Sequence, residues 1–293
     1  MTKRILLSLT IMFSLFLVFG CSQNSDITSP TSSDEIVLVQ RPEFVDTRPQ
    51  AVINAHIWAN PADYVQSAEK KVTIPPDDSG PDPNPNPAHK YAFVVGISDY
   101  EGDANDLQYC DDDAIAMAAY FQSQGFTVLS RIDGDATADN IVAGLNWLAA
   151  NAVAGDEIAF SYSGHGNSLN VGSVLISADL YYISHTYIMD IFNSANCTKK
   201  AVMIDACKAG SFLFDGETGS VVATASNNTY SYDAPTLYHG AWTYYWLEAA
   251  NGSYIYAEDI ATQAEIGMAE WAALYNVRIS PDHYDKYTGG FDI

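Results

Sequence analysis

The chain has 293 residues, enough for one large domain with additional segments or for two modest domains. Its hydrophobic content of 48% is typical of a protein with a packed core and excludes a chain that is disordered throughout. The 13 Lys and Arg stand against 36 Asp and Glu, a formal net charge of −23, which argues against a nucleic-acid partner and against a polybasic membrane patch. Four cysteines are too few for a disulfide scaffold in a chain of this length.

Residues 1–20 have the organisation of a signal peptide. Lys3 and Arg4 precede an uncharged run from Ile5 to Gly20, which is short for a membrane span. Residues 17–21, Leu-Val-Phe-Gly-Cys, resemble the lipobox of bacterial lipoproteins, which are cut before a Cys whose sulfur carries a diacylglyceryl group. The resemblance implies a bacterial protein that is lipidated at Cys21 and held on the cell envelope, at the outer membrane or the cell surface. Two alternatives for residues 1–20 remain open, an ordinary cleaved signal peptide and an uncleaved membrane anchor.

Residues 21–89 are predicted to be a tether. Ser, Thr and Asp dominate from Ser22 to Glu35, and residues 75–87 hold six of the twelve prolines, a composition that favours an extended, semi-rigid spacer. Residues 35–74 lie between the two stretches and have modest apolar content. They either pack on the following domain as a pro-segment or form a loosely ordered arm.

From Lys90 onward, strand patterns alternate with helical patterns in chain order. Apolar runs predict strands over residues 91–97, 126–131, 157–162, 200–204 and 220–225, whereas helical spacing predicts helices over 111–121, 139–150, 185–195, 240–250 and 258–275. Asp139 is the expected cap of the second helix. This alternation predicts one α/β domain over residues 90–293, a three-layer sandwich in which helices flank a mostly parallel sheet.

His165 and Cys207 follow neighbouring predicted strands, and ligand sites of parallel sheets form beyond the carboxyl ends of the strands. A nucleophilic Cys needs thiolate character and a base beside it, and a His can protonate a leaving amine near neutral pH. Glycines on both sides of His165 allow a substrate to approach the backbone closely. Taken singly, each residue also fits a structural role, as a loop histidine or a buried thiol.

Taken together, the motifs resemble the caspase–metacaspase clan of cysteine peptidases. The resemblance rests on residues 162–166 (Tyr-Ser-Gly-His-Gly) and 205–210 (Asp-Ala-Cys-Lys-Ala-Gly), and it extends to residues 96–114, 224–226 and 240–248. It covers the domain from residue 90 to residue 293 and implies a caspase-like fold. It also implies that Cys207 is the nucleophile and His165 the general acid and base. The backbone N–H groups of Gly166 and Cys207 would form the oxyanion hole.

The resemblance also implies which substrate side chain binds in the specificity pocket. Caspases carry Gln two residues before the nucleophile, in a basic pocket for Asp, whereas metacaspases carry Asp there and at a second position. Asp205 and Asp113 match those two positions, and two carboxylates favour an Arg or Lys side chain. Structural alternatives are a helix N-terminal charge for Asp113 and a strand-end residue bonded to backbone for Asp205. We expect an endopeptidase that cleaves proteins or peptides after Arg or Lys.

Two departures from the metacaspase pattern bear on the need for a cofactor and on self-cleavage. Residues 167–177 contain no carboxylate, so the sequence does not favour a calcium requirement, and we expect no cofactor and no metal site. Between Lys208 and Arg278 there is no Lys or Arg, so we expect no self-cleavage within that stretch and place any processing at Lys70, Lys71 or Lys90.

Two alternatives stay open. One is a non-catalytic, envelope-anchored binding or scaffold module of caspase-like shape, because Lys208 and Ala209 replace the commoner His-Ser after the nucleophile. The other is a clostripain-like, basic-specific cysteine peptidase, which the same dyad fits. Cys110 and Cys197 are interpreted as structural.

Overall fold

The computed structural model describes residues 38–41, 44–46 and 80–293. The predicted signal peptide and the predicted lipidation site Cys21 lie outside these residues. In the described part of the chain, no helix combines the length and the apolar character that crossing a membrane requires.

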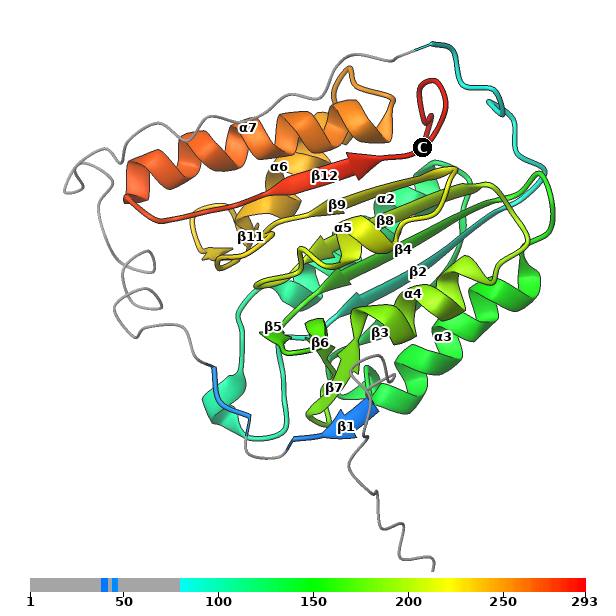
Figure 1. Cartoon of the computed structure of the whole chain (residues 1–293). Helices are drawn as coiled ribbons and strands as arrows, with labels where there is room; N and C mark the ends of the chain where they lie inside the picture. Colours follow the sequence, from blue (N-terminus) through cyan, green and yellow to red (C-terminus); the bar gives the residue numbers. More distant parts are fainter. Residues whose placement is uncertain (1–37, 42–43, 47–79) are drawn as a thin grey trace, which may run out of the picture. The chain divides into compact units, whose positions relative to one another are not determined.

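A six-stranded sheet with the strand order β12-β9-β8-β4-β2-β3 forms the middle layer (Figure 1). Five strands are parallel, namely β2 (Lys90–Gly96), β3 (Thr127–Ile132), β4 (Glu157–Ser163), β8 (Lys199–Asp205) and β9 (Ser220–Thr224). The edge strand β12 (Asp282–Asp285) runs antiparallel to β9. Every residue of β4, β8 and β9 is buried, as expected for strands that are covered on both faces.

Helices cover both faces of this sheet. One face carries α2 (Cys110–Ser123), α6 (Ala241–Ala250) and α7 (Ala257–Tyr275), and the other carries α3 (Ala138–Asn151), α4 (His185–Asn193) and the short α5 (Phe212–Asp215). Successive residues of β2 alternate between the two layers, because Ala92 and Val94 belong to one hydrophobic core and Phe93 and Val95 to the other. The predicted three-layer α/β sandwich with a mostly parallel sheet is confirmed.

A second, antiparallel sheet lies outside the predicted pattern. Its strands, in the order β1-β7-β6-β5, are β1 (Leu38–Gln40), β7 (Tyr181–Ser184), β6 (Gly172–Ile176) and β5 (Gly166–Leu169). The two-residue strands β10 (Asp233–Ala234) and β11 (His239–Gly240) pair separately, and two short 3₁₀ turns span Asp103–Asn105 and Asp133–Asp135. Since β5 begins directly after His165, this small sheet borders the site.

The predicted cap of the second helix is wrong by two residues. The side chain of Thr137, not that of Asp139, accepts the hydrogen bond from the Asn140 N–H, at 3.3 Å. Thr137 has the extended backbone of a capping residue, while Asp139 lies inside the first turn, where its carboxylate still interacts favourably with the helix dipole.

Parts of the predicted tether pack on the domain. Leu38–Gln40 pairs with β7 as β1, and Phe44 is buried in the hydrophobic core on the α3 side of the sheet. Within the proline-rich stretch, the buried carboxylate of Asp82 lies 2.8 Å from Nζ of Lys199 and accepts a hydrogen bond from the Tyr287 hydroxyl at 2.6 Å. The described end of the spacer is therefore anchored at the base of β8.

Candidate active site

The register of two central strands brings His165 and Cys207 to the same edge of the sheet. Ser163 and Asp205, the last residues of β4 and β8, face each other in the parallel ladder. His165 and Cys207 each follow this pair by two residues, and the Gly164 N–H donates to the Asp205 carbonyl at 3.1 Å. The structure therefore brings together the two residues that the motifs singled out.

The imidazole of His165 is held by a backbone carbonyl. Its Nε2 lies 2.7 Å from the carbonyl oxygen of Asn105, in the loop before α2. Because a carbonyl only accepts, Nε2 carries the hydrogen, and Nδ1 is the ring nitrogen that can take and return a proton. The rings of Tyr100 and Phe44 pack against the imidazole with centroid distances of 4.7 and 5.1 Å.

The Cys207 thiol lies at the surface of the site, whereas Cys110 and Cys197 are buried. Its Sγ accepts a hydrogen bond from the Ser231 N–H at 3.3 Å, which favours the thiolate, and the protonated thiol can donate to the Ser231 carbonyl at 3.9 Å. Burial raises the pKa of Cys110 well above its usual value, and burial also raises the pKa of Cys197. Among the described cysteines, Cys207 is therefore the one that is placed to act as a nucleophile.

Lys208 carries the turn that exposes Cys207. Its φ of 56° is left-handed, a conformation that a lysine rarely adopts. The nearby Gly210 has a different reason to be glycine, since a Cβ there would lie 2.0 Å from Oδ1 of Asn227. Lys208 itself therefore takes the left-handed conformation in this turn.

Gly166 lies against the backbone of Cys207. A Cβ at this position would lie 2.4 Å from the Cys207 carbonyl oxygen, so no other residue fits without a shift. The Ile176 N–H donates to the His165 carbonyl, which makes Gly166 and Leu175 a pair without mutual hydrogen bonds in the β5–β6 ladder. The Gly166 N–H thus points away from β6.

His165 and Cys207 line two narrow cavities together. One, of about 20 Å³, is bounded further by Leu107, Cys110, Ser163, Gly164, Asp205, Ser231, Tyr232, Asp233 and Gly240. The other, of about 10 Å³, is bounded further by Phe44, Asp46, Gly166, Lys208 and Tyr230. A cavity of this size holds about one water molecule. Carboxylates line the first cavity, and we call it the acidic pocket.

Asp205 lies in the wall of the acidic pocket and is almost fully buried. Its Oδ1 accepts a hydrogen bond from the Ser231 hydroxyl, and its Oδ2 accepts from the N–H and the hydroxyl of Thr243, at 3.1 and 2.7 Å. Burial raises the pKa of Asp205, although these hydrogen bonds act in the opposite direction.

Asp113 lies behind the pocket wall. It is fully buried, and its oxygens accept hydrogen bonds from the Ser163 hydroxyl at 2.7 Å and from the Gly240 N–H at 3.0 and 3.2 Å. Nδ1 of His239 lies 2.9 Å from Oδ1. A Cβ on Gly240 would lie 2.5 Å from Oδ2 of Asp205 and 2.7 Å from Oδ2 of Asp113, so both carboxyl groups converge on this glycine.

Sequence reasoning missed four residues of the site. Asp233 is the second carboxylate of the acidic pocket, and the Ser231 N–H reaches the thiol. Asn105 supplies a backbone carbonyl, and Phe44 comes from the predicted tether. The two aspartates that matched the motif differ in exposure to the pocket, because Asp205 lines it and Asp113 does not.

Among the residues with described positions, no group of three His, Cys, Asp or Glu side chains is arranged to hold a metal ion. Asp179, the lone acid that follows residues 167–177, accepts hydrogen bonds from the Ala138 N–H and the Ser177 hydroxyl, at 2.9 and 2.6 Å. These contacts give it a structural role at the start of α3.

Two known metacaspases are similar in sequence to part of the chain. Metacaspase-2 of Arabidopsis thaliana is 32% identical over 96 residues, 29% of this chain and 23% of that protein. Metacaspase-1 of Scheffersomyces stipitis is 30% identical over 89 residues, 27% of this chain and 22% of that protein. The alignments thus cover less than a quarter of the length of each relative.

The fold also matches a solved structure, that of the protein GSU0716 from Geobacter sulfurreducens. The TM-score is 0.54 at 17% identity, and the match covers 70% of this chain and 97% of that chain. The model of the caspase domain family matches residues 89–268, which include His165, Cys207 and the residues that line the acidic pocket. Since this match spans more than half of the sequence, the chain belongs to the caspase domain family.

Proposed function

We propose that the protein is a metacaspase-type cysteine endopeptidase that cleaves peptide bonds after Arg or Lys. The observation that carries the proposal is the register of Ser163 and Asp205, which sets His165 and Cys207 at one edge of the sheet beside the acidic pocket. Membership of the caspase domain family supports the peptidase chemistry.

The chemistry follows from the roles of the two side chains. Nδ1 of His165 takes the proton of the Cys207 thiol, and the thiolate attacks the carbonyl carbon of the scissile bond and forms a C–S bond. The C–N bond then breaks as Nδ1 of His165 gives its proton to the leaving amine. His165 next takes a proton from a water molecule, which attacks the thioester, releases the carboxylic acid and regenerates the thiol. The N–H groups of Gly166 and Cys207 stabilise the oxygen anion of each tetrahedral intermediate.

The preference for a basic side chain rests on charge. Asp205 and Asp233 line the acidic pocket, and Asp113 adds a third carboxyl group behind Gly240. The planar guanidinium of an arginine can bond two carboxylate oxygens at once, so Arg is preferred over Lys. Because the pocket holds about one water molecule, substrate entry requires a movement of the loop from Ser226 to His239, which forms one wall.

Envelope anchoring is part of the proposal. The sequence around Cys21 supports a diacylglyceryl anchor that places the peptidase on the bacterial envelope, with protein or peptide substrates and no cofactor. Metabolic labelling with a fatty acid tests this part, because Cys21→Ala should abolish incorporation and a Cys197→Ala control should keep it.

The test of the activity uses fluorogenic peptides that end in Arg, Lys or Asp, with and without calcium. The peptides that end in Arg and Lys should be cleaved, and Cys207→Ala should abolish cleavage while Cys197→Ala, at a buried thiol away from the pocket, should retain it. Faster cleavage after Asp would overturn the pocket assignment, and activity in Cys207→Ala would overturn the nucleophile.

Two observations favour a second candidate, a non-catalytic binding module. The acidic pocket is narrow, and the strained Lys208 follows the thiol where the family commonly has His. A chloromethyl ketone peptide ending in Arg separates the two functions, because a peptidase is labelled at Cys207 much faster than at other cysteines and an inert module is not. A clostripain-like peptidase would give the same labelling as a metacaspase.

A further inference from the structure

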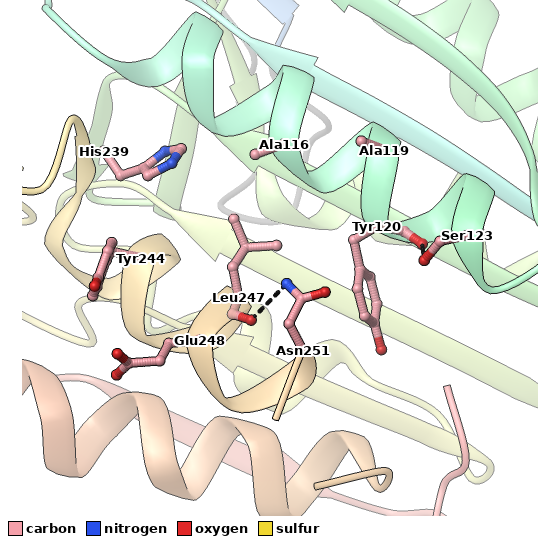
Figure 2. Close-up of a pocket in the computed structure, with 9 residues that line it drawn as sticks. All are labelled: Ala116, Ala119, Tyr120, Ser123, His239, Tyr244, Leu247, Glu248 and Asn251. Carbon is pink, nitrogen blue, oxygen red and sulfur yellow. Dashed lines mark hydrogen bonds between the residues drawn. The ribbon is translucent and has the colours of Figure 1, made fainter. Parts of the chain in front are cut away.

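His239 stands between the acidic pocket and a larger cavity. On one side, its Nδ1 lies 2.9 Å from Oδ1 of Asp113. On the other, the ring lines a cavity of about 520 Å³ between α2 and α6, next to Ala116 and Tyr244 (Figure 2). The side chain is 23% exposed, so it can exchange protons with solvent while it contacts a carboxyl group that has no exposure.

The surroundings of His239 are strongly acidic. The groups that face it are Asp112 and Asp113 from α2, Tyr244 and Glu248 from α6, Asp233 from β10 and Asp205 from the end of β8. Lys and Arg are absent from this set, so the imidazolium is the one positive charge that these described groups can supply. A protonated His239 therefore offsets one of the carboxylates around Gly240.

The pair formed by His239 and Asp113 has a simple charge count. When the two side chains share one proton, the pair is neutral, whichever of them holds it. When that proton leaves, the pair carries one negative charge, which lies close to Asp205 across Gly240.

We propose that His239 is a specificity-determining residue that adjusts the negative charge behind the acidic pocket, so that the preference for a cationic side chain strengthens when the His239–Asp113 pair loses its shared proton. The inference rests on the proposed function, because it concerns the pocket that holds the basic side chain of the substrate.

The protonation equilibria of the two groups place this change near or above neutral pH. Burial, together with the nearby charge of Asp205, raises the pKa of Asp113 to about 7. The hydrogen bond to Asp113 raises the pKa of His239 above its ordinary value. Because the two groups titrate together, the observed step belongs to the pair.

A matched pair of small molecules tests the charge directly. Benzamidine is a cationic mimic of an arginine side chain, and benzamide is its neutral counterpart, so the ratio of their affinities reports pocket charge without any catalytic step. In the full-length protein this ratio should rise by about tenfold through a step near or above neutral pH, because one more negative charge lies close to the bound cation.

Two variants move the step in the same direction. In His239→Gln, Asp113 has no second base with which to share its proton, so the step moves to lower pH. In Asp113→Asn, His239 loses its acceptor and titrates nearer its ordinary value, so the step also moves to lower pH. An upward shift in either variant would contradict a shared proton, and the profile of the unmodified protein tests the inference even if a variant does not fold.

The outcomes separate the inference from the proposed function. A flat affinity ratio from pH 5 to pH 9 in a protein that cleaves peptides after Arg would overturn the role of His239 and leave the function intact. The pH step and its shift to lower pH in both variants, in a protein that cleaves no peptide, would support the role of His239 and refute the peptidase.

Discussion

Nε2 of His165 lies 2.7 Å from the backbone carbonyl of Asn105, and the side chain of Asn105 in turn donates to the carbonyl of Phe44 at 3.2 Å. The Phe44 ring in turn packs edge-on against the imidazole of His165. These three residues form a closed set of contacts that fixes the orientation and the tautomer of His165. A segment that precedes the caspase domain therefore contributes to the position of His165, the proposed general acid and base.

Phe44→Ala should lower kcat by about tenfold and leave KM nearly unchanged, because a misplaced imidazole slows proton transfer without altering the substrate pocket. Global stability should also fall, because Phe44 is buried in the hydrophobic core. Steady-state kinetics with a peptide ending in Arg measures the effect. Val45→Ala is the matched control, because the Val45 side chain is 60% exposed. An unchanged kcat in Phe44→Ala would show that His165 is held without this contact.

Asp233→Asn should weaken cleavage after Arg by about tenfold, since it removes one of the two carboxylates that line the acidic pocket. The ratio of kcat/KM for peptides ending in Arg and in Gln measures the loss, because only the first carries a charge. Asp112→Asn, at an exposed position on α2, is the control for a general change of charge. If both variants lowered the ratio equally, the pocket would not be the source of the preference.

Stability should fall as the pH rises from about 4.5 toward 7, because burial raises the pKa of Glu258 to about 7. The folded protein holds the Glu258 proton more tightly than the unfolded chain, so this stabilisation is complete below the ordinary glutamate pKa and is lost as the pH rises through 7. The loss is on the order of 2 kcal/mol. Urea unfolding at several pH values measures it.

Glu258→Gln removes that titration and should flatten this part of the stability profile. Its carboxylate oxygens both lie 3.2 Å from the Phe291 N–H, so a Gln oxygen can keep one of these contacts. An equal slope in the variant would assign the pH dependence to other buried acids such as Asp113.

Active protein should keep its catalytic domain in one piece. No Lys or Arg lies between Lys208 and Arg278, so a peptidase that cuts only after basic residues has no bond to cleave there. Mass spectrometry of incubated protein should find new ends only near Lys70, Lys71 or Lys90. Two fragments separated between Ala209 and Val277 would contradict the basic specificity.

The sequence predicted the central layer well, because strands covered on both faces must be continuously apolar. Residues 158–160 and 201–204 meet that condition, and the order of these strands along the chain led directly to His165 and Cys207. The small antiparallel sheet escaped prediction because β5 has the sequence Gly-Asn-Ser-Leu, which lacks an apolar period. Its pairing comes from tertiary contacts.

Part of the site could not be predicted either, because its residues follow no side-chain pattern in the sequence. Asn105 acts through its backbone carbonyl, which no side-chain pattern reveals, and Asp233 lies in a polar loop without periodicity. The carboxyl groups of Asp113 and Asp205 both converge on Gly240, and the place of Asp113 behind that glycine depends on β11, a strand of two residues.

Cleavage of a fluorogenic peptide ending in Arg, compared between the unmodified protein and Cys207→Ala, tests the central claim most directly. The account predicts cleavage after Arg that exceeds cleavage after Asp and disappears in Cys207→Ala, while Cys197→Ala retains it. Equal cleavage in the unmodified protein and in Cys207→Ala would contradict the account.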